Sequence, residues 1–139
     1  MSQNKPVALT LCVQCGTPGF ERARNGKKRA NPANKKLAVE IRHLLENMPG
    51  GEHIQVRLSR CQQNCTNPCA WQLNSAHGEA LQFGKAGVPG GPQAADVAAV
   101  ACTYAALPSG GKINKQSFPP AAKGTMVARV APWPKPKSV

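Results

Sequence analysis

The sequence is poor in acidic residues, in aromatic residues and in long hydrophobic runs. Its 139 residues hold six Asp and Glu against 18 Lys and Arg, a formal net charge of +12. The acids show no paired arrangement suited to acid–base catalysis, and no glycine-rich phosphate loop is present. The longest apolar run near the start, VALTLCV, is far too short to span a bilayer. These features argue against an acid–base enzyme, a nucleotide-binding enzyme and a membrane protein.

The N-terminal residues show no charged leader followed by a small-residue cleavage site, so we expect a soluble, cytoplasmic protein. In that reducing compartment, clustered cysteines are more often metal ligands or redox groups than structural disulfides. Five of the six cysteines fall in two short motifs. CVQC supplies Cys12 and Cys15, and CQQNCTNPC supplies Cys61, Cys65 and Cys69. Enzymatic activity stays open, and any catalysis would run through these thiols or a metal that they bind.

The motifs follow two segments that read as neighbouring strands. Alternating hydrophobicity predicts strands at residues 7–13 and 53–60, the second with one wet face. Between them, an apolar stripe predicts a helix that begins near Asn31 and Pro32 and ends before Pro49. The stripe consists of Leu37, Ile41, Leu44, Leu45 and Met48. A strand, a helical crossover and a second strand favour a right-handed βαβ unit, whose parallel strands end at one edge. Both cysteine motifs are therefore expected at that edge.

The next elements are a hairpin and a second helix. Short strands are predicted at residues 70–74 and 80–83, joined by the turn sequence SAHGE. An alanine-rich helix is predicted from about residue 92 to 107, with Cys102 as a small core residue. Its expected buried side comprises Val97, Val100, Ala101 and Tyr104. This order predicts an α/β fold, a βαβ unit followed by a β-hairpin and a helix, as in a small thioredoxin-like domain.

The last part of the chain shows no clear periodicity. It is rich in Pro and Gly, carries six Lys and Arg between residues 112 and 137, and has no acid there. We therefore predict two regions, a thioredoxin-like metal-binding domain at 1–107 and an irregular basic C-terminal extension at 108–139.

Four features carry a resemblance to a known family: the strand ending in CVQC, the CxxxCxxxC run, LQFG at residues 81–84, and the final GKINKQSFPPAAKGTMVARVAP. With them the chain resembles a bacterial family of unknown function, described as predicted metal-binding proteins with a thioredoxin-like ferredoxin fold. The resemblance implies a metal centre, in the first place [2Fe-2S]. Thioredoxin-like ferredoxins separate their first two ligands more widely than CVQC does. Cys12, Cys61 and Cys65 thus match their pattern better than Cys15, and the fourth ligand is Cys15 or Cys69. We expect Cys12, Cys15, Cys61 and Cys65 to hold the centre, with Cys69 as the reserve ligand.

The residues support a thiolate site independently of the resemblance. Four thiolates complete a [2Fe-2S] cluster or tetrahedral zinc, and ligands two or three residues apart can share one centre. An iron–sulfur cluster predicts electron transfer or metal and redox sensing, whereas zinc predicts a structural or metal-handling role. The competing interpretation is a dithiol–disulfide oxidoreductase, in which Cys12 attacks and Cys15 resolves.

The positive charge is concentrated in residues 22–36 and in the tail. It suits an acidic redox partner protein, or nucleic acid in a basic binding module. The nucleic-acid hypothesis is the weaker one, because only Phe20, Phe118 and Trp133 lie near the basic residues to stack on bases. No membrane association is expected, and the wet face of the second strand leaves a homodimer open.

Overall fold

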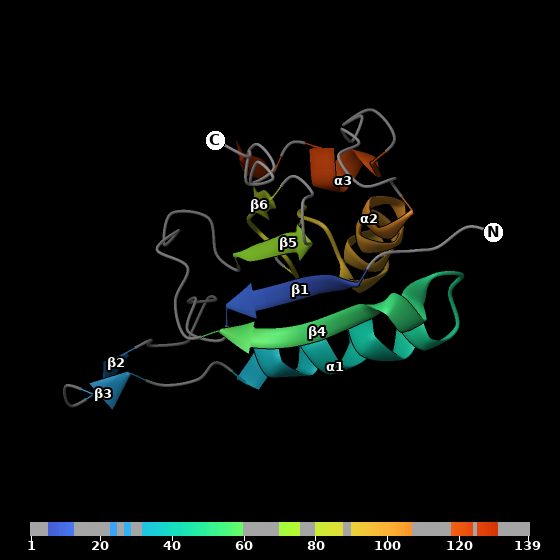
Figure 1. Ribbon diagram of the computed structural model, residues 1–139. Coiled ribbons are helices and arrows are strands. Elements are labelled where there is room, and N and C mark those ends of the chain that lie inside the picture. The colour runs from blue at the N-terminus through green and yellow to red at the C-terminus, as the bar shows by residue number, and fades with distance from the viewer. Residues whose placement is uncertain are drawn as a thin grey trace, which may run out of the picture.

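The computed structural model describes residues 6–12, 23–24, 27–28, 32–59, 70–75, 80–87, 90–106, 118–123 and 125–130. Within these residues, five strands form one mixed sheet in the order β4-β1-β5-β6-β7 (Figure 1). They are β1 (Val7–Cys12), β4 (Ile54–Ser59), β5 (Trp71–Ser75), β6 (Ala80–Phe83) and β7 (Met126–Val130). Two-residue strands β2 (Ala23–Arg24) and β3 (Lys27–Lys28) pair with each other separately. The predicted α/β class is confirmed.

The βαβ unit is present as predicted. Strand β1, helix α1 (Pro32–Glu46) and strand β4 follow one another, and the two strands are parallel, with arrowheads pointing the same way (Figure 1). Helix α1 begins at Pro32, whose fixed φ suits the first helical turn. The turn after α1 leads through the short 3-10 helix η1 (Gly51–His53). A side chain at Gly51 would collide with the backbone carbonyl of Leu45, so this turn requires glycine there.

The hairpin and the second helix are also confirmed. Strand β5 is antiparallel to both β1 and β6. Helix α2 (Ala94–Ala105) is capped by Gln93 and Asp96, which form a reciprocal capping box. Its predicted buried side is confirmed, since Val97, Val100, Ala101 and Tyr104 are all 0–1% exposed.

Helices α1 and α2 pack against each other, and both contact β1 and β4, so they cover one face of the sheet. The paired residues Leu9, Val56 and Leu73 share that face, as the strand alternation requires. Leu9 and Leu73 are fully buried there. Ala8 and Thr10 point to the opposite face, where they are half-buried. In β4, Gln55 and Arg57 are exposed and Ser59 is half-buried, which confirms the predicted wet face of this strand.

One helical position was predicted wrongly. Leu44 is 36% exposed, whereas Ala38 and Asn34 are buried on α1. At about 100° per residue, Asn34, Ala38 and Leu45 lie on one side of the predicted stripe, and Leu44 lies at its other margin. The buried face of α1 is thus rotated toward the small and polar residues.

The C-terminal region is not irregular throughout. It contains α3 (Pro120–Lys123) and β7, which pairs antiparallel with β6. Phe118 is 3% exposed and its ring lies 5.8 Å from that of Phe83, while Ala122 is fully buried. These residues belong to the same core as β1 and α2. The weak periodicity of this segment hid them, because β7 depends on pairing with a distant strand.

Among the described residues, no helix combines the length and the apolar character needed to cross a bilayer.

Candidate functional site

The carboxyl end of β1 is the point where the cysteine motifs meet the sheet. Cys12 is the last residue of β1 and lies in register with Ser59, the last residue of β4. On the other side of β1, the backbone N–H of Cys12 donates a 2.9 Å hydrogen bond to the carbonyl of Ala70, directly before β5. Cys12, Ser59 and Ala70 therefore lie side by side at one edge of the sheet.

Both motifs are attached to the sheet at these three residues. Cys12 begins CVQC, and Ser59 and Ala70 flank the segment that carries the second motif. In the sequence, Cys61 follows Ser59 by two residues, and Cys69 directly precedes Ala70. The chain that carries the second motif thus leaves the sheet on one side of β1 and returns to it on the other. The predicted shared edge is confirmed for the strand ends. Cys15, Cys61, Cys65 and Cys69 themselves lie outside the described residues.

Cys12 is held firmly in place. Its side chain is 1% exposed, and by strand alternation it shares a sheet face with Thr10, opposite the helices. Its carbonyl oxygen accepts a 3.0 Å hydrogen bond from the side-chain amide of Asn34, which is 2% exposed. At this edge the Ser59 hydroxyl lies 3.5 Å from the carbonyl oxygen of Leu11. The backbone of Cys12 is thereby fixed from β4, β5 and α1.

Asn34 was missed in the sequence, although one signal was present. It stands three residues before Leu37 and four before Ala38, on the apolar face of α1, where a polar side chain needs a buried partner. Its bond to Cys12 places the first turn of α1 against the edge where the motifs begin.

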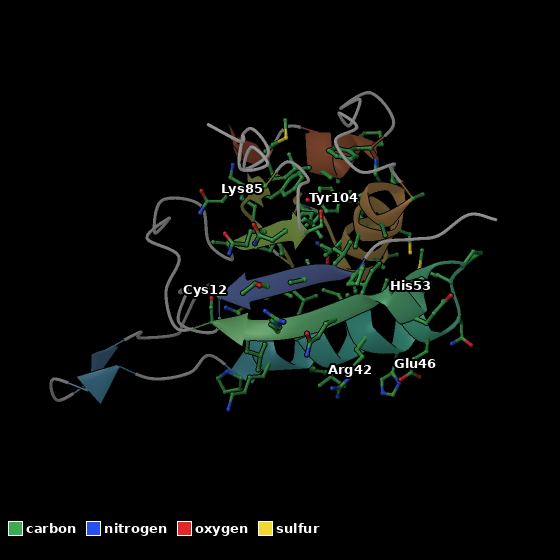
Figure 2. All side chains as sticks on the ribbon, in the orientation of Figure 1. Cys12, Arg42, Glu46, His53, Lys85 and Tyr104 are labelled. Atoms are coloured by element: carbon green, nitrogen blue, oxygen red, sulfur yellow. The ribbon has the colours of Figure 1, made fainter. Side chains whose placement is uncertain are left out.

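Cys102 lies far from this edge. It is half-buried on α2 and packs against the core, in agreement with its predicted structural role. Burial raises the pKa of the Cys102 thiol, and the carboxylate of Glu52 raises this pKa further. Glu52 precedes β4, at the opposite end of the strand from Ser59. Figure 2 shows Cys12 at the arrowhead of β1 and His53 at that opposite end.

The described histidines are exposed and paired with neighbouring acids. His43 lies 3.6 Å from Glu46, and His53 lies 3.4 Å from Glu52. Across the described ranges, no group of three or more His, Cys, Asp or Glu residues is placed to hold a metal ion. Four of the five predicted ligands fall outside those ranges, so the predicted ligand set stays a prediction.

The fold and the cysteine edge define a mixed α/β protein in which two cysteine motifs begin at one end of a parallel strand pair. The chain matches the family model described as "Protein of unknown function (DUF1636)" over residues 9–132, and it belongs to that family. The predicted membership of a family of unknown function is thus confirmed. No curated protein and no solved structure matches the chain. The thioredoxin-like ferredoxin description of the fold stays a prediction.

Proposed function

We propose that this protein binds a metal through its two cysteine motifs, in the first place a [2Fe-2S] cluster, and works in electron transfer or in metal or redox sensing. The observation that carries the proposal is the meeting of Cys12, Ser59 and Ala70 at one edge of the sheet. The proposal includes the thioredoxin-like ferredoxin fold. It is supported by the strand order β4-β1-β5-β6, formed by a βαβ unit and a hairpin and followed by α2.

Covalent connectivity links this edge to the other thiols. Two peptide units separate Cys61 from Ser59, one separates Cys69 from Ala70, and each spans about 3.8 Å between Cα atoms. Neighbouring strands lie about 4.8 Å apart. The attachment points of both motifs are thus separated by distances that a single thiolate-bound centre can bridge.

The charge of the chain favours a site built from thiolates, because a net charge of +12 offsets the negative charge of several thiolates. The hydrogen bond from Asn34 to the Cys12 carbonyl fixes the backbone from which the first motif leaves the sheet. Cys12, Cys15, Cys61 and Cys65 would hold the centre, with Cys69 as the reserve ligand. A [2Fe-2S] cluster at this position would supply one-electron redox chemistry.

Tetrahedral zinc held by the same thiolates is the second candidate, and it would give a structural or metal-handling protein. The dithiol oxidoreductase hypothesis is weakened by the burial of Cys12. An attacking thiolate must reach its substrate disulfide, yet the Cys12 side chain is 1% exposed. A catalytic role for CVQC would therefore need Cys12 to become accessible.

A cytoplasmic location and an acidic redox partner complete the proposal, because clustered thiols suit a reducing compartment and the chain is strongly basic. Nucleic acid is the weaker partner hypothesis, since only 4% of the residues are aromatic.

The proposal is tested by comparing Cys61→Ser with Cys102→Ala after anaerobic purification. The measured quantities are iron, sulfide and zinc per chain. Cys61→Ser removes a proposed ligand and should lose most of the bound metal. Cys102→Ala changes a thiol at the other end of the sheet and should keep the wild-type metal content. Equal metal content in the wild type and Cys61→Ser would refute the assignment of Cys61, and metal-free wild type would refute the centre.

A further inference from the structure

The exposed aliphatic side chains of the described residues gather on two neighbouring elements. Leu58 of β4 is 50% exposed, and Val39 and Leu44 of α1 are 44% and 36% exposed. Leu58 pairs in register with Leu11, which is fully buried on the helix-covered face. The two leucines share that face, yet only Leu11 is covered. Helix α1 therefore leaves the last part of β4 open.

A groove of about 320 Å³ lies between α1 and β4. We call it the α1–β4 groove, and its lining residues are Lys35, Ala38, Val39, Arg42, Val56 and Leu58. Its floor is aliphatic, and two cationic side chains, Lys35 and Arg42, stand on its helical side. No acid belongs to the lining. The groove is thus apolar and positively charged.

Strand β4 also forms the edge of the sheet within the described residues, beside β1 and with no second neighbour there. An edge strand presents backbone N–H and C=O groups that can pair with an added strand. Its side chains alternate between Val56 and Leu58 in the groove and the exposed Gln55 and Arg57 on the other face. A strand added to this edge would meet an apolar pocket on one face and a guanidinium on the other.

We propose that the α1–β4 groove binds an extended acidic segment of a partner protein, which adds to the edge of β4. Apolar side chains of the segment pack on Val39 and Leu58. Its carboxylates lie near Lys35, Arg42 and Arg57. Charge complementarity selects this occupant, because the chain carries +12 and the groove presents cations around an aliphatic floor.

The same charges disfavour other occupants. A second copy joined edge to edge would bring two sets of these cations together, and the chain's own residues 131–139 carry two lysines and no acid. Leu44 lines a separate hollow on α1 together with Glu40 and Lys36, so an anionic membrane lying on Leu44 would meet an acid as well as a cation there. Nucleic acid would find aliphatic rather than aromatic side chains to contact.

The groove borders the cysteine edge. Leu58 directly precedes Ser59, which lies in register with Cys12. A segment bound here would bring its protein beside the candidate centre. A role of the groove in electron transfer rests on the proposed function, whereas the binding of the segment does not.

The test uses a fluorescein-labelled octapeptide of sequence Val-Glu-Glu-Glu-Val-Glu-Glu-Glu, with fluorescence anisotropy as the readout. In an added strand, one face of this peptide carries both Val and Glu toward the groove and its cations, and the other face carries Glu toward Arg57. The full-length protein should bind it saturably at low salt and more weakly at high salt. The same peptide with Lys in place of Glu should not bind. Arg42→Glu and Leu58→Ser should each weaken binding about tenfold. Lys85→Glu is the matched control, because it makes the same charge change as Arg42→Glu at an exposed site well away from Arg42 (Figure 2). It should change the affinity for the peptide less than about twofold.

Equal weakening by Lys85→Glu and Arg42→Glu would overturn the proposal in favour of general charge attraction, and no saturable binding up to about 1 mM would overturn it outright. Sedimentation and phosphatidylserine vesicle binding are measured on the same proteins. A dimer or a vesicle complex that Leu58→Ser abolishes would assign the groove to that occupant instead. Metal content is measured in parallel, so a protein that takes up no metal even after reconstitution but still binds the peptide would refute the proposed function and support the groove.

Discussion

The side-chain amide of Asn34 donates a 3.0 Å hydrogen bond to the carbonyl oxygen of Cys12, joining the first turn of α1 to the last residue of β1. Both residues are 1–2% exposed. The bond fixes the carbonyl of the residue from which CVQC leaves the sheet. It also joins α1 to the edge that carries the candidate centre, so this contact bears on both the stability of the fold and the geometry of the site.

Asn34→Ala should lower the free energy of unfolding by about 1–3 kcal/mol, because the buried Cys12 carbonyl loses a donor. Asn47→Ala is the matched control. Its side chain donates a 3.3 Å bond to the His43 carbonyl on the exposed side of α1, so a loss below about 0.5 kcal/mol is expected. Urea unfolding measures both. Equal losses of unfolding free energy would show that the buried Asn34 bond stabilises the fold no more than the exposed Asn47 bond does.

Phe118→Ala should lower the free energy of unfolding by about 3 kcal/mol. The ring lies in the C-terminal region, yet it is buried against Phe83. Val39→Ala removes an aliphatic group that is 44% exposed and should cost less than about 1 kcal/mol. Thermal or urea unfolding compares the two variants. A Phe118→Ala protein as stable as Val39→Ala would mean that this region does not contribute to the core.

The Cys102 thiol should react slowly with iodoacetamide at pH 8. Burial and the carboxylate of Glu52 both raise its pKa, so less reactive thiolate is present. Glu52→Gln removes the second cause and should speed alkylation, with peptide mapping by mass spectrometry as the readout. Unfolding in urea should speed it further. Equal rates in the native and unfolded protein would contradict the burial of this thiol.

The same raised pKa predicts a pH dependence of stability. The folded state holds the Cys102 proton more tightly than the unfolded state does. The contribution of this thiol to the free energy of unfolding is therefore complete below the pKa of the unfolded thiol. It is lost as the pH rises toward the pKa of the thiol in the folded state. Wild type should lose stability in that alkaline range relative to Cys102→Ala. Parallel urea-unfolding curves for the two proteins, separated by a constant amount at every pH, would contradict this linkage.

The sequence predicted those parts of the fold that rest on local patterns. The alternation in β1 and β4 and the stripe with Ile41 established the βαβ unit, and hence the shared edge of Cys12 and Ser59. Leu44 was misjudged because hydrophobicity alone does not tell which side of a broad stripe meets the sheet. Phe118 and β7 were missed because their partners, Phe83 and β6, are distant in the chain.

The candidate site was likewise predictable only where it depends on local sequence patterns. Its location follows from strand direction, which periodicity and chain order determine. Asn34 escaped notice because its role depends on a contact 22 residues away, with the backbone of Cys12. The choice between Cys15 and Cys69 as the fourth ligand depends on contacts between segments that are distant in the sequence, which no hydrophobic pattern encodes.

The proposed metal centre is tested by anaerobic purification of the full chain, followed by a visible absorption spectrum and by iron, sulfide and zinc analysis of the same sample. We expect visible absorption bands with about two irons and two sulfides per chain. One zinc per chain and no iron would instead support a zinc site held by the same thiolates. A colourless protein that binds neither metal, even after reconstitution with iron and sulfide, would contradict the metal centre altogether.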